Sequence, residues 1–210
     1  TSPIDLLEEL DPAGLVEPPL DAGPEVASAP ALVERLRELT ECDDDSRYRD
    51  LVRQVVYAAQ ELAAQGVADE AYRALLVLGL HAGDDAKRSF AQRESASEGL
   101  AQLAHGAVLD DLLKRACDAS ADTSLPATGV LRELGARSAS RVLDQLEVEM
   151  DSERRGRLTG VLLAMGEDVS PALADAIARG SKRRQRVALR LAGETQNPRL
   201  VLNLREAMLD

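Results

Sequence analysis

The sequence has few aromatic side chains and little isoleucine, and this scarcity limits the folds that it can adopt. Of the 210 residues, three are tyrosine, one is phenylalanine and none is tryptophan, and isoleucine occurs only at positions 4 and 177. Strands favour aromatic and β-branched side chains, whereas the alanine, leucine, arginine and glutamate that dominate this chain favour helices. The composition therefore argues against an all-β fold or a parallel sheet, and it predicts an all-α fold.

Long apolar runs are missing as well. A helix that spans a bilayer needs roughly 20 apolar residues, and no run in this sequence approaches that length. Nothing resembles a signal peptide. The two cysteines, Cys42 and Cys117, show no CxxC or metal-ligand spacing. We therefore expect two free thiols, a cytoplasmic location and no membrane partner.

Sequence motifs of catalysis are also missing. The chain has no HExxH, GxxxxGK[ST], GxGxxG or GxSxG pattern, and these are the patterns that mark common metal, phosphate, dinucleotide and hydrolase sites. Its two histidines, His81 and His105, stand near expected helix ends, where capping or surface roles are usual. We expect no enzymatic activity, no cofactor and no bound metal.

The net charge of −12 is concentrated near the N-terminus. Residues 1–45 contain thirteen acids and two bases, whereas the remaining residues are nearly balanced, with 24 acids and 23 bases. Six of the nine prolines lie in the first 30 residues, and proline prevents long helices there. We predict an acidic, proline-rich, disordered arm over residues 1–30, followed by a helical domain over residues 31–210. Such acidity disfavours nucleic-acid binding.

Apolar residues recur at helical spacing from residue 31 onward, which indicates roughly a dozen helices joined by short turns. Leucines 32, 36 and 39 mark the first helix, and the apolar residues of 51–62 and 75–80 mark the next two. Further helices are expected near residues 85–94, 97–105, 107–118, 126–134, 138–150, 152–165, 170–179, 182–192 and 198–208.

The C-terminal half contains an internal repeat. Residues 128–135 (TGVLRELG) recur as residues 159–166 (TGVLLAMG) with five of eight identical, and residues 186–193 (RVALRLAG) form a third copy. Each copy ends at a glycine, so we expect positive φ at a helix C-terminus at Gly135, Gly166 and Gly193.

A short second helix follows each repeated segment. Ser170 or Asn197 is expected to cap it, with a proline at its first position. Its apolar side chains should face inward, and we place these at Leu143, Leu146, Leu173, Ile177, Leu200 and Leu204. A hairpin of about 30 residues cannot bury its apolar face alone, so neighbouring hairpins must stack.

These arginine- and alanine-rich helices ending in Leu-Gly resemble the HEAT repeat, in particular its short bacterial, PBS-lyase-type form, most clearly over residues 126–210. The resemblance implies a right-handed α-solenoid and a non-catalytic protein–protein interaction, scaffold or regulatory module. Because the chain begins at Thr1 rather than methionine, and arginine outnumbers lysine by 22 to 3, we expect part of a larger bacterial protein. Two alternatives stay open: a HEAT-like enzyme of the DNA alkylpurine glycosylase or lyase type, and a homo-oligomerisation domain.

Two surfaces are candidates for partner binding. In HEAT-like proteins the second helices line the concave surface, and the helical period places these outward residues there: Arg141, Asp144, Asp175, Arg179, Arg199, Asn203 and Glu206. A basic patch without acids follows, made of Lys182, Arg183, Arg184, Arg186 and Arg190. Its arginines are expected mainly to pair with acids of the neighbouring repeat. An acidic partner, the chain's own acidic arm and nucleic acid are the alternatives, and nucleic acid is disfavoured because no aromatic side chain follows Phe90.

Overall fold

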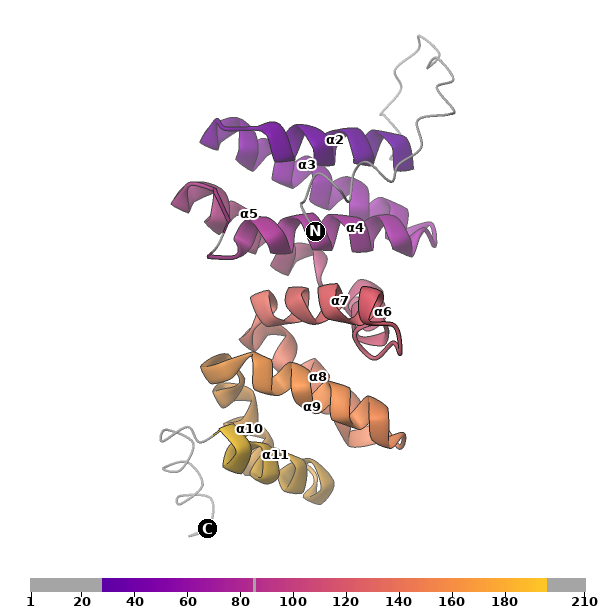
Figure 1. Cartoon of the computed structure of the whole chain (residues 1–210), viewed down its shortest axis with the longest axis vertical. Coiled ribbons are helices and arrows are strands. Elements are labelled where there is room, and N and C mark those ends of the chain that lie inside the picture. Colours follow the sequence, from indigo (N-terminus) through magenta and orange to yellow (C-terminus); the bar gives the residue numbers. More distant parts are fainter. Residues whose placement is uncertain (1–27, 85, 196–210) are drawn as a thin grey trace. The chain divides into compact units, whose positions relative to one another are not determined.

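The computed structural model describes residues 28–84 and 86–195, and these are predominantly helical, with no strand among them. Figure 1 labels the helices, which are α2 (Ala29–Glu41), α3 (Asp45–Ala64), α4 (Ala68–Ala82), α5 (Phe90–Leu103), α6 (Gly106–Ala116), α7 (Ala121–Leu134), α8 (Ala136–Val148), α9 (Ser152–Ala164), α10 (Ser170–Arg179) and α11 (Lys182–Thr195). A 3₁₀ turn, η1 (Gly166–Val169), precedes α10. The predicted all-α fold is confirmed for this part of the chain. Residues 1–27 of the predicted arm, and the predicted helix 198–208, lie outside it.

The chain forms two compact units, unit 1 (Thr1–Gly99) and unit 2 (Leu100–Asp210). The boundary falls inside α5, which is a continuous helix. No run of glycine or proline marks this position in the sequence, where we expected two helices (85–94 and 97–105) within a single domain. That expectation of two helices is wrong, because residues 94–97 (ESAS) contain no residue that stops a helix.

Unit 1 is organised around α3, which packs against both α2 and α4. The predicted leucines of α2 are all buried, as is the apolar stripe of α3. Local signals set the helix starts: the Ser28 side chain accepts a hydrogen bond from the Ala31 N–H, and the Asp44 carboxylate accepts one from the Arg47 N–H. These side chains satisfy N–H groups that have no partner within their helices.

A buried polar cluster connects α3, α4 and the segment before α5. The Tyr48 hydroxyl lies 2.8 Å from Nδ1 of His81, and the Arg88 guanidinium lies 5.4 Å from the centroid of the Tyr48 ring. His81 is 6 % exposed, so its expected capping or surface role is wrong. The cause is the helical period of α4, which places His81 three residues after buried Leu78.

Arg88 also closes the end of α2. Its guanidinium donates hydrogen bonds to three backbone carbonyls, those of Leu39, Thr40 and Cys42. The last carbonyls of a helix have no partner within it. Arg88 thus supplies these partners from a segment more than forty residues away in sequence.

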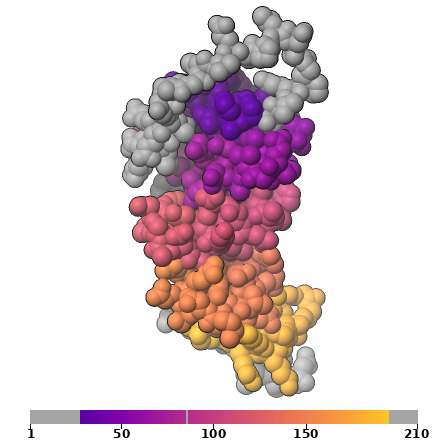
Figure 2. All heavy atoms as spheres, turned by 90° about the vertical axis from the view of Figure 1, so that its right-hand side faces the viewer, coloured from indigo at the N-terminus to yellow at the C-terminus, as the bar shows by residue number. Residues whose placement is uncertain are grey.

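Unit 2 is built from pairs of helices: α6 packs along α7, α8 along α9, and α10 along α11. Helix α8 also contacts α10 and α11, and α9 contacts α7 and α11. In Figure 2 the orange α8–α9 region meets the yellow α11 region. The closest packing therefore joins the second helix of one predicted repeat to the first helix of the next. The helices on either side of Gly135 contact each other less extensively.

The structure confirms two of the three predicted glycine conformations. Gly135 has φ +50° and Gly166 has φ +60°, each directly after the end of a helix or its cap. The prediction is wrong for Gly193, which lies within α11. The helix continues past this glycine to Thr195. A glycine inside a helix is tolerated at a cost of about 1 kcal/mol relative to alanine.

Other boundaries move by a few residues. Helix α7 begins at Ala121 rather than Pro126, so the proline lies inside the helix. Ser170 is not the cap of α10, because the turn η1 leads directly into the helix and the capping position is Val169. The predicted inward residues Leu143, Leu146, Leu173 and Ile177 are all buried, as expected.

Candidate functional site

The described part of unit 2 contains an open hollow lined by arginines. Its volume is about 370 Å³, and its lining consists of Arg155 from α9 together with Arg183, Arg186, Val187 and Arg190 from α11. We call it the arginine hollow. Among the described residues, no acidic side chain lines it. Several cations around one concave surface make a candidate site for an anion.

Helix α11 brings three arginines to one face. Positions 183, 186 and 190 are three and four residues apart, the spacing at which side chains are neighbours on a helix. Beside them, Val187 and Ala188 are buried and belong to the face that packs on the rest of unit 2. Since these apolar contacts fix the rotation of α11, they also fix the direction of the arginine face.

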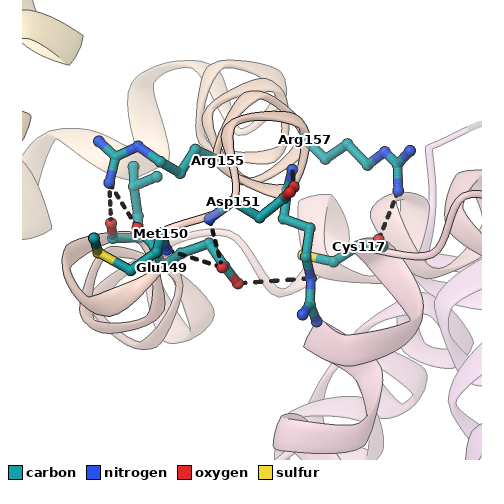
Figure 3. A network of polar contacts seen from close by, with 8 residues as sticks. Cys117, Glu149, Met150, Asp151, Arg155 and Arg157 are labelled. Carbon is teal, nitrogen blue, oxygen red and sulfur yellow. Dashed lines mark hydrogen bonds and ion pairs between the residues drawn. The ribbon is translucent and has the colours of Figure 1, made fainter.

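Arg155 is positioned by the end of α8. Its Nη1 donates to the carbonyl oxygens of Leu146 and Glu149, at 3.1 Å and 3.0 Å. Figure 3 shows the Arg155 side chain reaching these carbonyls, while Arg157 extends the other way and donates to the Cys117 carbonyl at 2.7 Å. Two anchoring hydrogen bonds hold the Arg155 guanidinium in place and leave its other N–H groups for a ligand.

Glu149 holds Arg155 through its carbonyl, while its carboxylate is engaged elsewhere. Glu149 accepts hydrogen bonds from the backbone N–H groups of Met150 and Asp151, and it lies 3.6 Å from Arg154 (Figure 3). These contacts, the Asp151 N–H first, lower the pKa of Glu149 below its usual value. The buried Cys117 thiol has a raised pKa because of burial, against an opposing effect of Arg154.

Most other arginines of unit 2 have acidic partners. The ion pairs are Arg115–Asp111, Arg132–Glu133, Arg141–Asp110, Arg154–Glu149, Arg157–Glu153, Arg179–Asp175 and Arg184–Asp144. Within the described part of the chain, Arg190 is the one arginine of the hollow with an acidic partner, Glu194 at 3.6 Å. Arg186 makes no hydrogen bond or ion pair with the described residues. The hollow therefore concentrates positive charge that unit 2 elsewhere neutralises.

Exposed apolar side chains adjoin the hollow at the end of α8. Met150 is 79 % exposed, and its sulfur lies 3.6 Å from Nη2 of Arg183. Val148, which is 64 % exposed, ends α8 beside it. An exposed methionine next to cations offers apolar contact to a ligand that also has negative charge.

The structure divides the predicted basic patch. Arg183, Arg186 and Arg190 line the hollow. Arg184 turns away and pairs with Asp144 of α8. It therefore has an acidic partner, but that partner lies in the first predicted repeat, two before its own, and not in the neighbouring repeat as expected. Lys182 is exposed at the first residue of α11.

The predicted outward residues of the second helices lie at the surface, but they are paired. Arg141 bonds Asp110 of α6 at 2.7 Å, and Asp175 bonds Arg179 one turn further along α10. Because Asp144 and Asp175 each have an arginine partner, they do not form a row of free carboxylates. The other three predicted residues, Arg199, Asn203 and Glu206, lie outside the described residues.

Arg155 was not among the predicted site residues. Its neighbours Arg154 and Arg157 pair with acids, and the sequence does not distinguish the three. The one available signal is spacing: Arg155 lies three residues before buried Leu158 and seven before buried Leu162. That places it at the edge of the packed face of α9, toward other elements rather than toward solvent alone.

No group of three or more potential metal ligands occurs among residues 28–84 and 86–195. Across the same residues, none of the helices combines the length and the apolar character needed to cross a membrane. Comparison with protein-family models, with curated proteins and with solved structures found no match.

Proposed function

We propose that this chain is a non-catalytic protein-interaction module that binds an acidic segment of a partner protein at the arginine hollow. The observation that supports this most is the contrast within unit 2. Most described arginines of unit 2 outside the hollow pair with acids, whereas Arg155, Arg183 and Arg186 have no acidic partner among the described residues. Unpaired like charges held together do not stabilise a fold, so a role in binding explains them better.

The chemistry of the hollow suits a peptide with carboxylates. A guanidinium can donate two parallel hydrogen bonds to one carboxylate, which gives geometric selectivity as well as affinity. Val148 and Met150 add apolar contact at one side. The hollow is lined by five residues, whereas a standard interface involves about 20–30 residues on each side. It would therefore serve as an anchor within a larger contact surface.

The HEAT-like, right-handed solenoid is part of the same proposal. Paired helices that pack on the next pair, and glycines with positive φ at the ends of α7 and α9, support it. Stacked helical hairpins offer an extended surface to a partner. We also keep the expectations that the module is bacterial and acts in the cytoplasm.

Capture from native lysate on the immobilised full chain tests this function. Four proteins would be compared: the wild type, Arg186→Glu, Arg179→Glu on α10, and the control Arg132→Glu, which reverses one exposed charge on α7 outside the hollow. We expect the wild type and the control to retain the same partner and Arg186→Glu to lose it. A segment of that partner rich in Asp and Glu should then bind the wild type directly, as measured by calorimetry.

Three results would overturn the proposal. The first is equal loss of the partner with Arg186→Glu and with the control Arg132→Glu. The second is a retained partner whose binding segment is not acidic. The third is loss with Arg179→Glu instead, which would move the site to the outward face of α10. The hollow could also bind a second copy of this chain. Light scattering measures the molar mass of the purified chain and so distinguishes a homo-oligomer from a complex with a different protein.

A further inference from the structure

The arginine hollow is short relative to an extended acidic peptide. Along α11, Arg183 and Arg190 are about 10 Å apart, at 1.5 Å per residue, and Arg155 faces the same hollow from α9. Four arginines from two helices thus line one open hollow of about 370 Å³. Carboxylates on successive outward residues of an extended peptide are about 7 Å apart, so at most about two of them can reach this lining at once.

The charge of the lining favours a ligand with more than one negative charge. A single carboxylate brings one negative charge, whereas the four arginines bring four positive charges and Glu194 offsets one of them. A phosphoryl monoester has a charge of about −1.5 to −2 at neutral pH and three terminal oxygens. It can accept hydrogen bonds from several guanidinium groups at once.

The surroundings favour a phosphorylated side chain over a nucleotide or nucleic acid. No Phe, Tyr or Trp follows Phe90 in the sequence, so unit 2 lacks the large aromatic rings that usually stack on a base. The exposed Met150, which contacts Arg183 of the hollow, instead suits an apolar residue of a peptide.

Arg155 is prepared for such a ligand before it binds. The two carbonyls at the end of α8 fix its guanidinium, so less rotamer freedom is lost when a phosphoryl group arrives. Arg186, which has no partner among the described residues, provides the most available donors.

From these observations we propose that the arginine hollow recognises a phosphorylated serine or threonine in the acidic segment of the partner. This deepens the proposed function and rests on it. The partner would then bind roughly tenfold more tightly after its modification, and the other contacts of the interface would add affinity without this dependence.

Fluorescence anisotropy with labelled peptide libraries tests the inference on the full chain. The libraries share a central position flanked by degenerate residues that include Asp, Glu and Leu, and the central residue is phosphoserine, glutamate or serine. A fluorescent single-stranded oligonucleotide serves as a fourth probe. Each is measured with the wild type, Arg186→Gln, Arg183→Gln and the control Arg132→Gln, after circular dichroism shows that all four proteins are folded.

We expect the phosphoserine library to bind the wild type and the control roughly tenfold more tightly than the glutamate library, since hydrogen bonds to charged groups are the strong ones. In Arg186→Gln and Arg183→Gln, this preference should fall to about twofold or less. Equal binding of the phosphoserine and glutamate libraries would overturn the phosphoryl inference and leave the proposed function standing. No binding of any anionic peptide would overturn both. Tighter binding of the oligonucleotide than of the phosphoserine library would also overturn the inference. So would a preference for phosphoserine over glutamate that stays unchanged in Arg186→Gln and in Arg183→Gln.

Discussion

The hydroxyl of Tyr48 lies 2.8 Å from Nδ1 of His81, and both side chains are buried, Tyr48 completely. On the other side of the imidazole ring, Nη2 of Arg88 lies 3.5 Å from Nε2. Burial first, and then the positive charge of Arg88, lower the pKa of His81 to about 4. Burial raises the pKa of Tyr48. The imidazole is therefore neutral in the folded protein at neutral pH.

This pair predicts an acid sensitivity of unit 1. In the unfolded chain a histidine binds its proton near pH 6.5, whereas folded His81 does so only near pH 4. Between these values the unfolded state holds more protons, so the free energy of unfolding should fall as the pH falls from about 6.5 to about 4, by up to about 3 kcal/mol. Urea denaturation of the wild type and of His81→Gln at several pH values measures this difference.

The second histidine provides the control for the acid experiment. His105→Gln removes a histidine from unit 2 and leaves the Tyr48–His81 contact in place, so it should retain the acid dependence of the wild type. The same pH dependence in His81→Gln and the wild type would contradict the assignment, because other titrating groups are shared by both proteins.

The two glycines with positive φ that end predicted repeats should respond differently to alanine. At Gly135 a Cβ would lie 2.6 Å from Oδ2 and 3.2 Å from Cβ of Asp168, whereas at Gly166 nothing lies within 4 Å. We expect Gly166→Ala to cost about 1 kcal/mol for the backbone conformation alone. Gly135→Ala should cost about 2–4 kcal/mol, because the strain of the backbone at positive φ and the close contact with Asp168 both destabilise the variant. Thermal denaturation compares them.

A helical glycine and a double variant complete this glycine series. Gly129 lies inside α7, and a Cβ added there would meet nothing within 4 Å, so Gly129→Ala should stabilise by about 0.5–1 kcal/mol. If the contact with Asp168 matters, Gly135→Ala combined with Asp168→Ala should be less destabilised than the sum of the two single variants. Equal losses for Gly135→Ala and Gly166→Ala would contradict the role of the contact.

The register of α10 predicts a contrast between two neighbouring positions. Leu173 is fully buried, and its truncation to alanine should cost about 2–5 kcal/mol. Asp175 is 44 % exposed and pairs with Arg179 on the surface, so Asp175→Asn should cost less than about 1 kcal/mol. Chemical denaturation of both variants measures the difference, and equal losses would show that the assigned inward and outward faces are wrong.

The periodic pattern predicted most of the fold because burial follows helical spacing. The buried leucines of α2 and α10 and the glycine ends of α7 and α9 were all visible in the sequence. The pattern failed where ends depend on weak signals. Glycine at position 193 is compatible with either the end or the interior of a helix, because glycine adopts positive and negative φ with similar ease. Pro126 similarly looked like a helix start, although α7 begins five residues earlier.

The candidate site was only partly predictable because it depends on which arginines find partners. The sequence showed the basic residues of 182–190, but it could not show that Arg184 reaches Asp144 while Arg186 does not pair. Arg155 joins the hollow through two carbonyls at the end of another helix, a contact without a sequence signature. Tyr48 and His81 did have a signal, since each continues the apolar stripe of its own helix.

The last prediction separates binding from stability on one helix. Arg184 is paired with Asp144 and its side chain is 20 % exposed, so Arg184→Gln should lower the free energy of unfolding by about 1–2 kcal/mol, because it leaves a carboxylate without its partner. Arg186→Gln removes one of four neighbouring positive charges and no described contact. It should be neutral or stabilise by up to about 0.5 kcal/mol, and any gain should shrink as NaCl rises from about 0.05 to about 0.5 M, because salt screens exposed charges. Urea denaturation at both salt concentrations measures this. If Arg186→Gln destabilises as much as Arg184→Gln, then Arg186 has a structural role, and the charge of the arginine hollow would need no ligand to explain it.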